Sequence, residues 1–508
     1  MRVNLFRFLR LLPAALLSVF ALSAGAQSFR VQCPTTTALH PGLPSDAGAI
    51  KCQQISGGDG FATMADGSQT YLFAFGPLSG LADIKAGLPG TEGQAVFNTP
   101  NPFTTNAAAD PTASNGAVGL TPDPNLPAGS PLDGHVDPRP IMDVGVMNGN
   151  MPAPTMAIDE DDEFFLTLTN VGMIMRPDLF EQHTVHFHGY PNASSFYDGV
   201  PDASVAINIG GSFTYYYLAP DAGTYFFHCH ITPPEHLQMG MVGQIYVRPR
   251  QNRVPLGTSL YAALAAHELA TADPRQRCGT DILCPANLPH TDNGATRVNN
   301  KSGAPTLYAY NDGDGSTAYD VEYPIQIHGF DPNFHFVGMT FNPEPFTDMK
   351  DKYFLLNGRS YPDTVTAGPM QTQVSDGTSH FSQPLPTIIN IPVGGKALLR
   401  ISDLDVTEFQ TLASLGLPMR VVGYNARLLR DMAGNNTAYT TNSITLAGGE
   451  SLDAILDASD TSKFKAGDTY YLYTPNLDHL ANDAENFGGL MTEVHICNSV
   501  DPTAKTCS

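Results

Sequence analysis

One stretch constrains the chain more than any other: FFHCHITPPEHLQMGM, residues 226–241, holds a cysteine between two histidines. Side chains of an extended strand alternate between its two faces. Cys229 is therefore expected on one face of a sheet, with His228 and His230 on the other. A fold that contains this stretch presents metal-ligand side chains on both sides of one strand.

A second histidine-rich stretch, EQHTVHFHGY at residues 181–190, has the same alternation. His186 and His188 share one face, and His183 lies on the opposite one. If the two stretches form neighbouring strands, one pocket gathers His183 and Cys229. The other pocket then gathers four histidines.

The turn after Cys229 carries His236 and Met241, and it can bring them beside His183. Two histidines, a thiolate and a weak methionine form the trigonal ligand set of a blue-copper site. Soft sulfur ligands favour copper over hard cations. Zinc also accepts cysteine and histidine, but a zinc site would not explain six histidines divided between two faces.

The four-histidine pocket suits a second copper centre, because imidazole is an expected copper ligand. Its members are His186, His188, His228 and His230. The backbone around Cys229 would join the two centres, so electrons could pass from its sulfur to His228 or His230. We therefore expect Cys229, His228 and His230 to have catalytic roles.

The beginning of the chain reads as a secretory signal peptide, residues 1–26, with a basic start, an apolar run and a small-residue cleavage site at Ala24-Gly25-Ala26. No later segment is apolar enough to span a bilayer. We expect a periplasmic or secreted protein. The net charge of −23 disfavours nucleic acid and anionic membranes as partners.

The chain has seven cysteines, and most should be paired in an oxidising compartment. Proximity in the sequence suggests the pairs Cys33–Cys52, Cys278–Cys284 and Cys497–Cys507, although sequence alone does not prove connectivity. Under this pairing Cys229 is the unpaired thiol. Binding to a metal would protect this thiol and give it a function.

Short apolar runs with a period of two, bounded by Gly, Pro, Asp or Asn, dominate the chain and predict an all-β protein. Residues 207–230 resemble two later segments, 389–401 and 446–475, and these are candidate internal repeats. In each of them a Gly-Gly turn precedes a strand. The expected organisation has a copper-binding domain with an N-terminal loop-rich extension, a linker, and a second domain. Their bounds are 27–250, 251–302 and 303–508.

Aligning the two units indicates that the second has lost its copper ligands. Tyr323, Gln326 and His328 align with His183, His186 and His188. Tyr473, Thr474 and Pro475 align with His228, Cys229 and His230. Leu490 aligns with Met241.

The runs HTVHFHG, DGVPD and GTYFFHCH, in this order, resemble a copper-binding domain of the multicopper oxidase family. YFLLNGRSYPDT, residues 353–364, resembles a run in a later domain of the same family. The resemblance covers roughly residues 140–250 and 320–496. It implies tandem cupredoxin-like Greek-key β-sandwich domains with long loop insertions.

The resemblance also implies roles for the ligands. His183, Cys229, His236 and Met241 match the type 1 copper ligands, and His186, His188, His228 and His230 match half of the trinuclear cluster that reduces dioxygen to water. Cys229 and His236 are seven positions apart, against the family's usual five. The family uses eight histidines for the cluster, so a second copy of the chain would have to supply four, or the cluster is partial or absent.

These patterns lead to a hypothesis of an exported copper oxidase that takes electrons from a reduced metal ion or a phenolic donor and passes them to dioxygen. The alternative is a type 1 copper protein that transfers electrons or binds copper without oxygen reduction. A two-copper enzyme of nitrite-reductase type ranks last, because His230 matches the oxidases instead.

Overall fold

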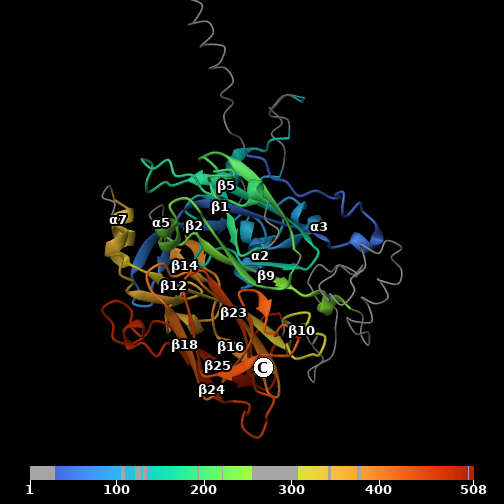
Figure 1. Ribbon diagram of the computed structural model, residues 1–508. Helices are drawn as coiled ribbons and strands as arrows, with labels where there is room; N and C mark the ends of the chain where they lie inside the picture. Colours follow the sequence, from blue (N-terminus) through green and yellow to red (C-terminus); the bar gives the residue numbers. More distant parts are fainter. Residues whose placement is uncertain are drawn as a thin grey trace, which may run out of the picture.

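The computed structural model describes residues 29–103, 109–120, 128–129, 134–190, 194–219, 221–254, 307–340, 345–373, 379–501 and 503–508. The expected signal peptide, the Cys278–Cys284 pair and nearly all of the expected linker lie outside the described residues. Two β-sandwich domains make up the described chain, and they form the upper and lower halves of Figure 1. The prediction of an all-β chain with two sandwich domains is confirmed.

Two sheets face each other in the first domain, with strand orders β2-β1-β5-β7 and β4-β9-β8-β6, and β3 pairs with β1. The strands are β1 (Ile50–Thr63), β2 (Gln69–Pro77), β3 (Glu92–Gly93), β4 (Met156–Asp159), β5 (Glu163–Gly172), β6 (His186–His188), β7 (Ser212–Leu218), β8 (Gly223–His228) and β9 (Val242–Arg248). Short helices decorate this domain: α2 (Leu81–Lys85), α3 (Gln94–Phe97), α4 (Pro138–Gly145) and α5 (Pro233–Gln238).

The alternation of side chains explains why these segments form a sandwich. In β7, Tyr215 and Tyr217 are buried while their neighbours are partly exposed. The two tyrosines join Leu166 and Leu168 of β5 and Phe227 of β8 in one apolar core. Each buried aromatic ring removes a large apolar area from water, which drives the two sheets together.

The second domain repeats the arrangement with sheets ordered β13-β12-β17-β23-β19-β20 and β16-β25-β24-β18-β22, and β21 pairs with β19. The small pairs β10–β11 and β14–β15 lie outside the two sheets. The elements are β10 (Leu307–Tyr308), β11 (Ala318–Tyr319), β12 (Val321–Phe330), α7 (Pro332–Gly338), β13 (Tyr353–Leu356), β14 (Met370–Gln373), β15 (Ser379–Gln383), β16 (Ile389–Pro392), β17 (Lys396–Asp403), β18 (Gln410–Leu415), β19 (Met419–Tyr424), β20 (Arg427–Leu428), β21 (Tyr439–Thr441), β22 (Ser443–Leu446), β23 (Glu450–Asp457), β24 (Thr469–Tyr473) and β25 (Met491–Cys497).

Strand pairing defines how the two domains correspond. β1 runs parallel to β5 and β4 to β9, just as β12 runs parallel to β17 and β16 to β25. By this order β23 corresponds to β7, which agrees with the predicted repeat at 446–475. The predicted repeat at 389–401 is wrong, because that segment forms β16 and β17, the counterparts of β4 and β5.

The expected N-terminal loop-rich extension of the first domain is preceded by two strands of the sandwich. Residues 50–77 form β1 and β2, and β1 is the central strand between β2 and β5. Its three glycines hid this strand, because Gly57, Gly58 and Gly60 interrupt the apolar alternation that identifies strands. The first sandwich therefore begins near residue 50.

The two domains are joined by buried polar contacts. Arg248 of β9 donates to Glu322 of β12 at 2.6 Å, and the Thr224 hydroxyl donates to Asp453 at 2.6 Å. Helix α5 lies beside α7 in Figure 1. The side-chain amide of Gln238 on α5 donates to Asp351 at 2.9 Å and accepts the Asp331 backbone N–H at 3.0 Å.

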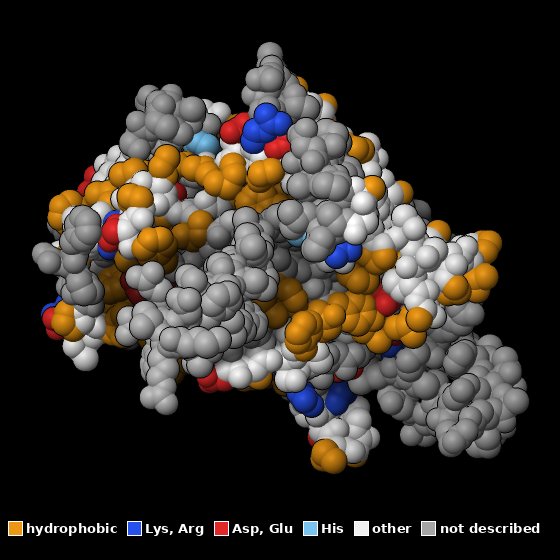
Figure 2. Space-filling model, turned by 90° about the horizontal axis from the view of Figure 1, so that it is seen from above, with side chains coloured by type: hydrophobic (Ala, Val, Ile, Leu, Met, Phe, Trp, Pro, Cys, Tyr) orange, Lys and Arg blue, Asp and Glu red, His pale blue; other side chains and the backbone are white. Residues whose placement is uncertain are grey.

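The structure contains the expected Cys33–Cys52 and Cys497–Cys507 disulfides, and it leaves Cys229 as a buried free thiol. Within the described residues, no helix combines the length and apolarity needed to span a lipid bilayer. The face seen in Figure 2 carries several hydrophobic patches and only scattered acidic and basic side chains.

Candidate metal centre

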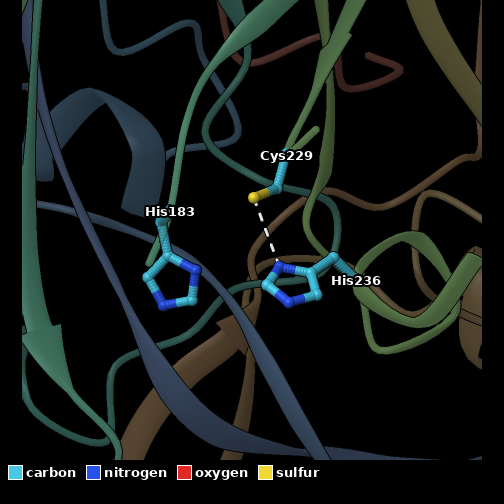
Figure 3. Close-up of side chains that lie close together, drawn as sticks. All are labelled: His183, Cys229 and His236. Atoms are coloured by element: carbon cyan, nitrogen blue, oxygen red, sulfur yellow. Dashed lines mark hydrogen bonds between the residues drawn. The ribbon is translucent and has the colours of Figure 1, made fainter. Parts of the chain in front are cut away.

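The first group of ligands comes from three separate places in the first domain. His183 lies just before β6, Cys229 follows the end of β8, and His236 lies on α5. One ligand atom from each lies within 4.8 Å of the others. Figure 3 shows the Cys229 sulfur directed between the two rings, with Nδ1 of His236 3.2 Å from it.

Backbone hydrogen bonds hold the cysteine in this position. The Thr184 N–H donates to the Cys229 sulfur at 3.4 Å, and the His230 N–H donates to the Thr184 hydroxyl at 2.9 Å. The Cys229 N–H donates to the Met241 carbonyl at 3.1 Å. These bonds tie the segment after β8 to the segments that carry His183 and Met241.

The electrostatics of this group favour an ionised sulfur. Burial alone would raise the pKa of the Cys229 thiol, but the positive charge of His236 and the neighbouring His183 hold it well below its usual value. The thiolate in turn raises the pKa of His236 to about 10, although burial alone would lower it. A metal that binds to the thiolate and His236 displaces the proton of this imidazole.

The residues present fit a copper ion. His183 is fully buried, and neither of its ring nitrogens makes a hydrogen bond with the described residues. A buried imidazole without a partner is costly, and a metal would supply the missing interaction. Met241 is also fully buried, and two imidazoles, a thiolate and a thioether together are the soft donor set that copper prefers.

Glycine at position 57 makes room for this group. A Cβ atom on Gly57 would lie 2.7 Å from Cδ2 of His183 and 3.4 Å from Cε of Met241. The former distance is too short for non-bonded carbon atoms. The β1 backbone can therefore lie against the His183 ring only because residue 57 has no side chain.

Replacing Gly57 by alanine is expected to displace the His183 ring and weaken copper binding at this group, by about tenfold or more. The measurement is copper affinity by competition with a chromophoric chelator. Thermal unfolding of the metal-free variant is the control for an intact fold. An unchanged affinity in a folded variant would show that His183 is no ligand.

The second group lies on the opposite side of the same strands. His186 and His228 are directly paired across β6 and β8, and ligand atoms of His186, His188 and His228 lie within 4.8 Å of one another. His230 completes the group, with its ring centroid 5.2 Å from that of His186 and 5.7 Å from that of His228.

Hydrogen bonds leave specific ring nitrogens free in this group. Nδ1 of His186 lies 2.7 Å from the Asp198 carbonyl oxygen, and Nδ1 of His228 lies 2.9 Å from the Cys229 carbonyl oxygen. The Nε2 atoms of both rings are therefore the ones available to a metal. A carbonyl acceptor on the other nitrogen is the usual way in which proteins orient a ligating histidine.

Two histidines of this group, His188 and His228, are kept neutral, which is the state that binds metal. Burial, with smaller contributions from His186, His188 and His230, lowers the pKa of His228 to about 3. Burial and its histidine neighbours also lower the pKa of His188. Protons therefore compete weakly with a metal for these two imidazoles at neutral pH.

The counterparts of the ligands in the second domain carry no metal-binding side chain. β18 pairs with β24 so that Ala413 lies opposite Tyr473, as His186 lies opposite His228. The same pairing equates Leu415 with His188. The predicted counterparts Gln326 and His328 are therefore wrong, because they lie on β12, the counterpart of β1.

The predicted counterparts near Cys229 agree with the structure. The Thr474 N–H donates to the Leu490 carbonyl at 2.9 Å, as the Cys229 N–H donates to the Met241 carbonyl. Thr474 and Leu490 therefore occupy the places of the cysteine and the methionine. Half of the alignment between the two domains therefore agrees with the structure, and the other half was misplaced.

Two further buried histidines of the second domain, His335 and His479, have structural partners. Nδ1 and Nε2 of His335 face the carbonyl oxygens of Tyr71 and Gln238. His479 stacks on Phe354, and its ring nitrogens face Gln410 and Glu408 at 2.9 Å each. These bonds join secondary-structure elements and leave both rings without a nitrogen for metal.

Three supporting residues escaped the sequence analysis. Gly57 clears space for His183, Asp198 orients His186, and Gln238 anchors α5, the helix of His236, to the second domain. The DGVPD run that contains Asp198 was noted only as part of a resemblance. The role of Gln238 has no local sequence signal, because its partners lie about a hundred residues away.

Comparisons with known proteins find similarity in the first domain. Residues 134–252 match the family model described as multicopper oxidase. A multicopper oxidase of Talaromyces pinophilus is 32% identical over 139 residues, which cover 26% of this chain and 21% of that protein. The laccase abr2 of Aspergillus fumigatus is 34% identical over 109 residues, covering 21% of this chain and 17% of that protein.

Among solved structures, the chain is similar to a blue copper oxidase from Nitrosomonas europaea. The two share 16% sequence identity and a TM-score of 0.48, over 88% of this chain and 85% of that one. The chain spans only about a fifth of the length of the curated relatives it matches. Residues 134–252, within the first domain, are thus similar to a domain of the multicopper oxidases.

Proposed function

We propose that the protein is a copper-dependent oxidoreductase that takes single electrons at the Cys229 group and delivers them to dioxygen at the four-histidine group. The observation that carries this proposal is the placement of three consecutive residues. Cys229 belongs to one group of ligands, and its neighbours His228 and His230 belong to the other. The two sites are thus linked by a few covalent bonds.

The chain provides two short electron paths between the sites. One runs from the Cys229 sulfur through its backbone to His230. The other reaches His228, whose Nδ1 lies 2.9 Å from the Cys229 carbonyl oxygen. Copper, when bound, supplies the one-electron redox chemistry at both ends. The thiolate, the buried histidines and the backbone hydrogen bonds around Cys229 would hold the ion in a fixed place.

Electrons would enter beside His236. Its Nε2 lies 3.6 Å from a carboxylate oxygen of Glu181, whose side chain is 28% exposed. This carboxylate connects the buried imidazole with the surface and could hold a reduced metal ion. A phenolic donor at the same edge is the other donor class that we propose.

The overall reaction balances four one-electron oxidations against one dioxygen molecule. Four donor molecules each lose one electron, and dioxygen takes up these electrons with four protons to give two water molecules. The test is dioxygen uptake by copper-loaded protein with Fe(II) or a phenolic donor. We expect about four donor molecules oxidised per dioxygen consumed. Donor oxidation without dioxygen uptake would instead support the electron-transfer alternative.

The family's trinuclear centre uses eight histidines, twice the four that the described part of this chain gathers beside His186. A second copy that placed its own four histidines opposite those of the first would complete such a centre, through an isologous contact. This arrangement makes oxygen reduction depend on oligomer formation. The alternative is a centre that works with the histidines of one chain, and the mass of the active, copper-loaded species separates the two. Export to the periplasm or the medium is part of the proposal.

A further inference from the structure

A pocket of about 460 Å³ opens in front of the four-histidine group. His188 and His228 line one wall together with Pro233, Pro234 and Leu237. The opposite wall belongs to the second domain of the same chain, and it consists of residues 404–409 and 447–449. The pocket therefore lies at the seam between the domains.

The second-domain loops come close to the metal-binding side chains. A Cβ atom on Gly449 would lie 3.8 Å from Nε2 of His188 and 3.7 Å from its Cε1. The other side of the His188 ring packs on Phe226, with ring centroids 4.6 Å apart. The loops of this chain therefore form a wall of the pocket in front of His188, on the side from which histidines of another copy would have to approach.

We propose that this pocket binds a small, uncharged aromatic molecule beside the four-histidine centre, and that the second domain forms its far wall. The proposal rests on the proposed function, because it places the ligand beside the copper that these histidines would hold. It assigns a role to a domain that has lost the ligands of its own. The pocket size falls within the range of ordinary small-molecule sites.

The walls define the chemical class of the ligand. Leu237, Leu404, Val406 and Phe409 give the pocket an apolar surface, and no lysine or arginine among the described residues lines it. The Phe409 ring is 72% exposed, which makes it available for stacking. An apolar and aromatic lining without a cation selects an uncharged aromatic ring over an anion.

The two carboxylates in the lining reinforce this selection. Asp405 shapes the loop, because it accepts the backbone N–H of Thr407 at 2.8 Å and the side-chain amide of Gln410 at 2.6 Å. Glu408 is fixed by His479, whose Nε2 lies 2.9 Å from its carboxylate. Their negative charge at the wall would repel an anionic ligand.

The test uses protein with Cys229→Ser, loaded with Cu(II), so that copper is bound only at the four histidines. Benzyl alcohol and benzoate serve as probes, because they share a ring and differ in charge. We expect benzyl alcohol to change the copper EPR spectrum in a saturable manner. We expect benzoate to bind at least about tenfold more weakly.

A Phe409→Ala substitution should weaken benzyl alcohol binding by about tenfold, because the ring loses its stacking partner. Phe487→Ala is the matched control, since Phe487 is also exposed, lies in the second domain and does not line the pocket. We expect the control to bind both probes as the parent does. Saturation-transfer NMR with metal-free wild-type protein should detect benzyl alcohol independently of copper.

Several results would overturn the proposal. A copper signal that benzyl alcohol leaves unchanged, or equal binding by the Phe409 and Phe487 variants, would show that the pocket is no such site. A four-histidine copper signal that appears only in an oligomer would show that another copy occupies this space. Absence of any copper signal would contradict the proposed function and this inference together, whereas NMR binding in that case would leave an apolar site unrelated to copper.

Discussion

Replacing Cys229 by serine is expected to abolish the intense blue absorption at about 600 nm that a copper–thiolate bond gives. A serine hydroxyl at this place stays protonated and is a hard, weak ligand for copper. The loss should include the type 1 EPR signal and about one copper ion per chain. Absorption, EPR and metal analysis of the same purified, copper-loaded sample measure all three quantities.

Met241→Leu is the matched control for this substitution. The axial methionine is a weak ligand, so the variant should keep its blue colour with a shifted reduction potential. Both residues are fully buried, and both variants change one sulfur-bearing side chain. Blue colour that survives in the serine variant would show that Cys229 does not bind copper.

Replacing His186 and His188 together by alanine is expected to eliminate dioxygen uptake while the blue colour remains. Both side chains belong to the four-histidine group, and neither contributes to the group around Cys229. The donor should still reduce the blue site once, because the electron entry side is intact. Dioxygen electrode traces and the bleaching of the blue band under anaerobic conditions measure the two halves separately.

His495→Ala provides the control for the double substitution. His495 lies on β25 in the second domain and pairs with Glu493 at 2.7 Å, far in the topology from either ligand group. Its removal should leave dioxygen uptake unchanged. Full dioxygen uptake by the double variant would contradict the role of the four histidines.

Alternation along two short stretches was enough to divide the ligands into two groups. Cys229 and its two neighbours lie on opposite faces because side chains of an extended strand alternate. His183 and His186 are three positions apart, so the same alternation places them on opposite faces. Local patterns of this kind survive any arrangement of the strands in space. The unpaired state of Cys229 was likewise open to inference, because the other described cysteines lie close to their partners in the sequence.

Features that depend on strand pairing could not be obtained in this way. The Tyr323–His328 stretch alternates as the His183–His188 stretch does, so the alignment equated them. Only the pairing of β18 with β24 shows that Ala413 and Leu415 are the true counterparts. The register between distant strands is fixed by the folded core, and a sequence read alone does not contain it explicitly.

Close approaches between distant segments are a second kind of feature that was hidden. Gly57 belongs to a glycine-rich run, and nothing nearby in the sequence indicates that His183 packs on it. The interdomain pocket depends in the same way on Phe409 and Gly449 lying opposite His188 and His228. Contacts of this kind follow from tertiary structure alone.

The most direct test of the account is an anomalous-scattering map, recorded at the copper absorption edge from crystals of copper-loaded protein. We expect one peak bounded by His183, Cys229 and His236, and a separate copper site on the reverse side of the strands, beside His186, His188 and His228. A map without density beside the Cys229 sulfur, or with both metals on one side of the sheet, would contradict the account.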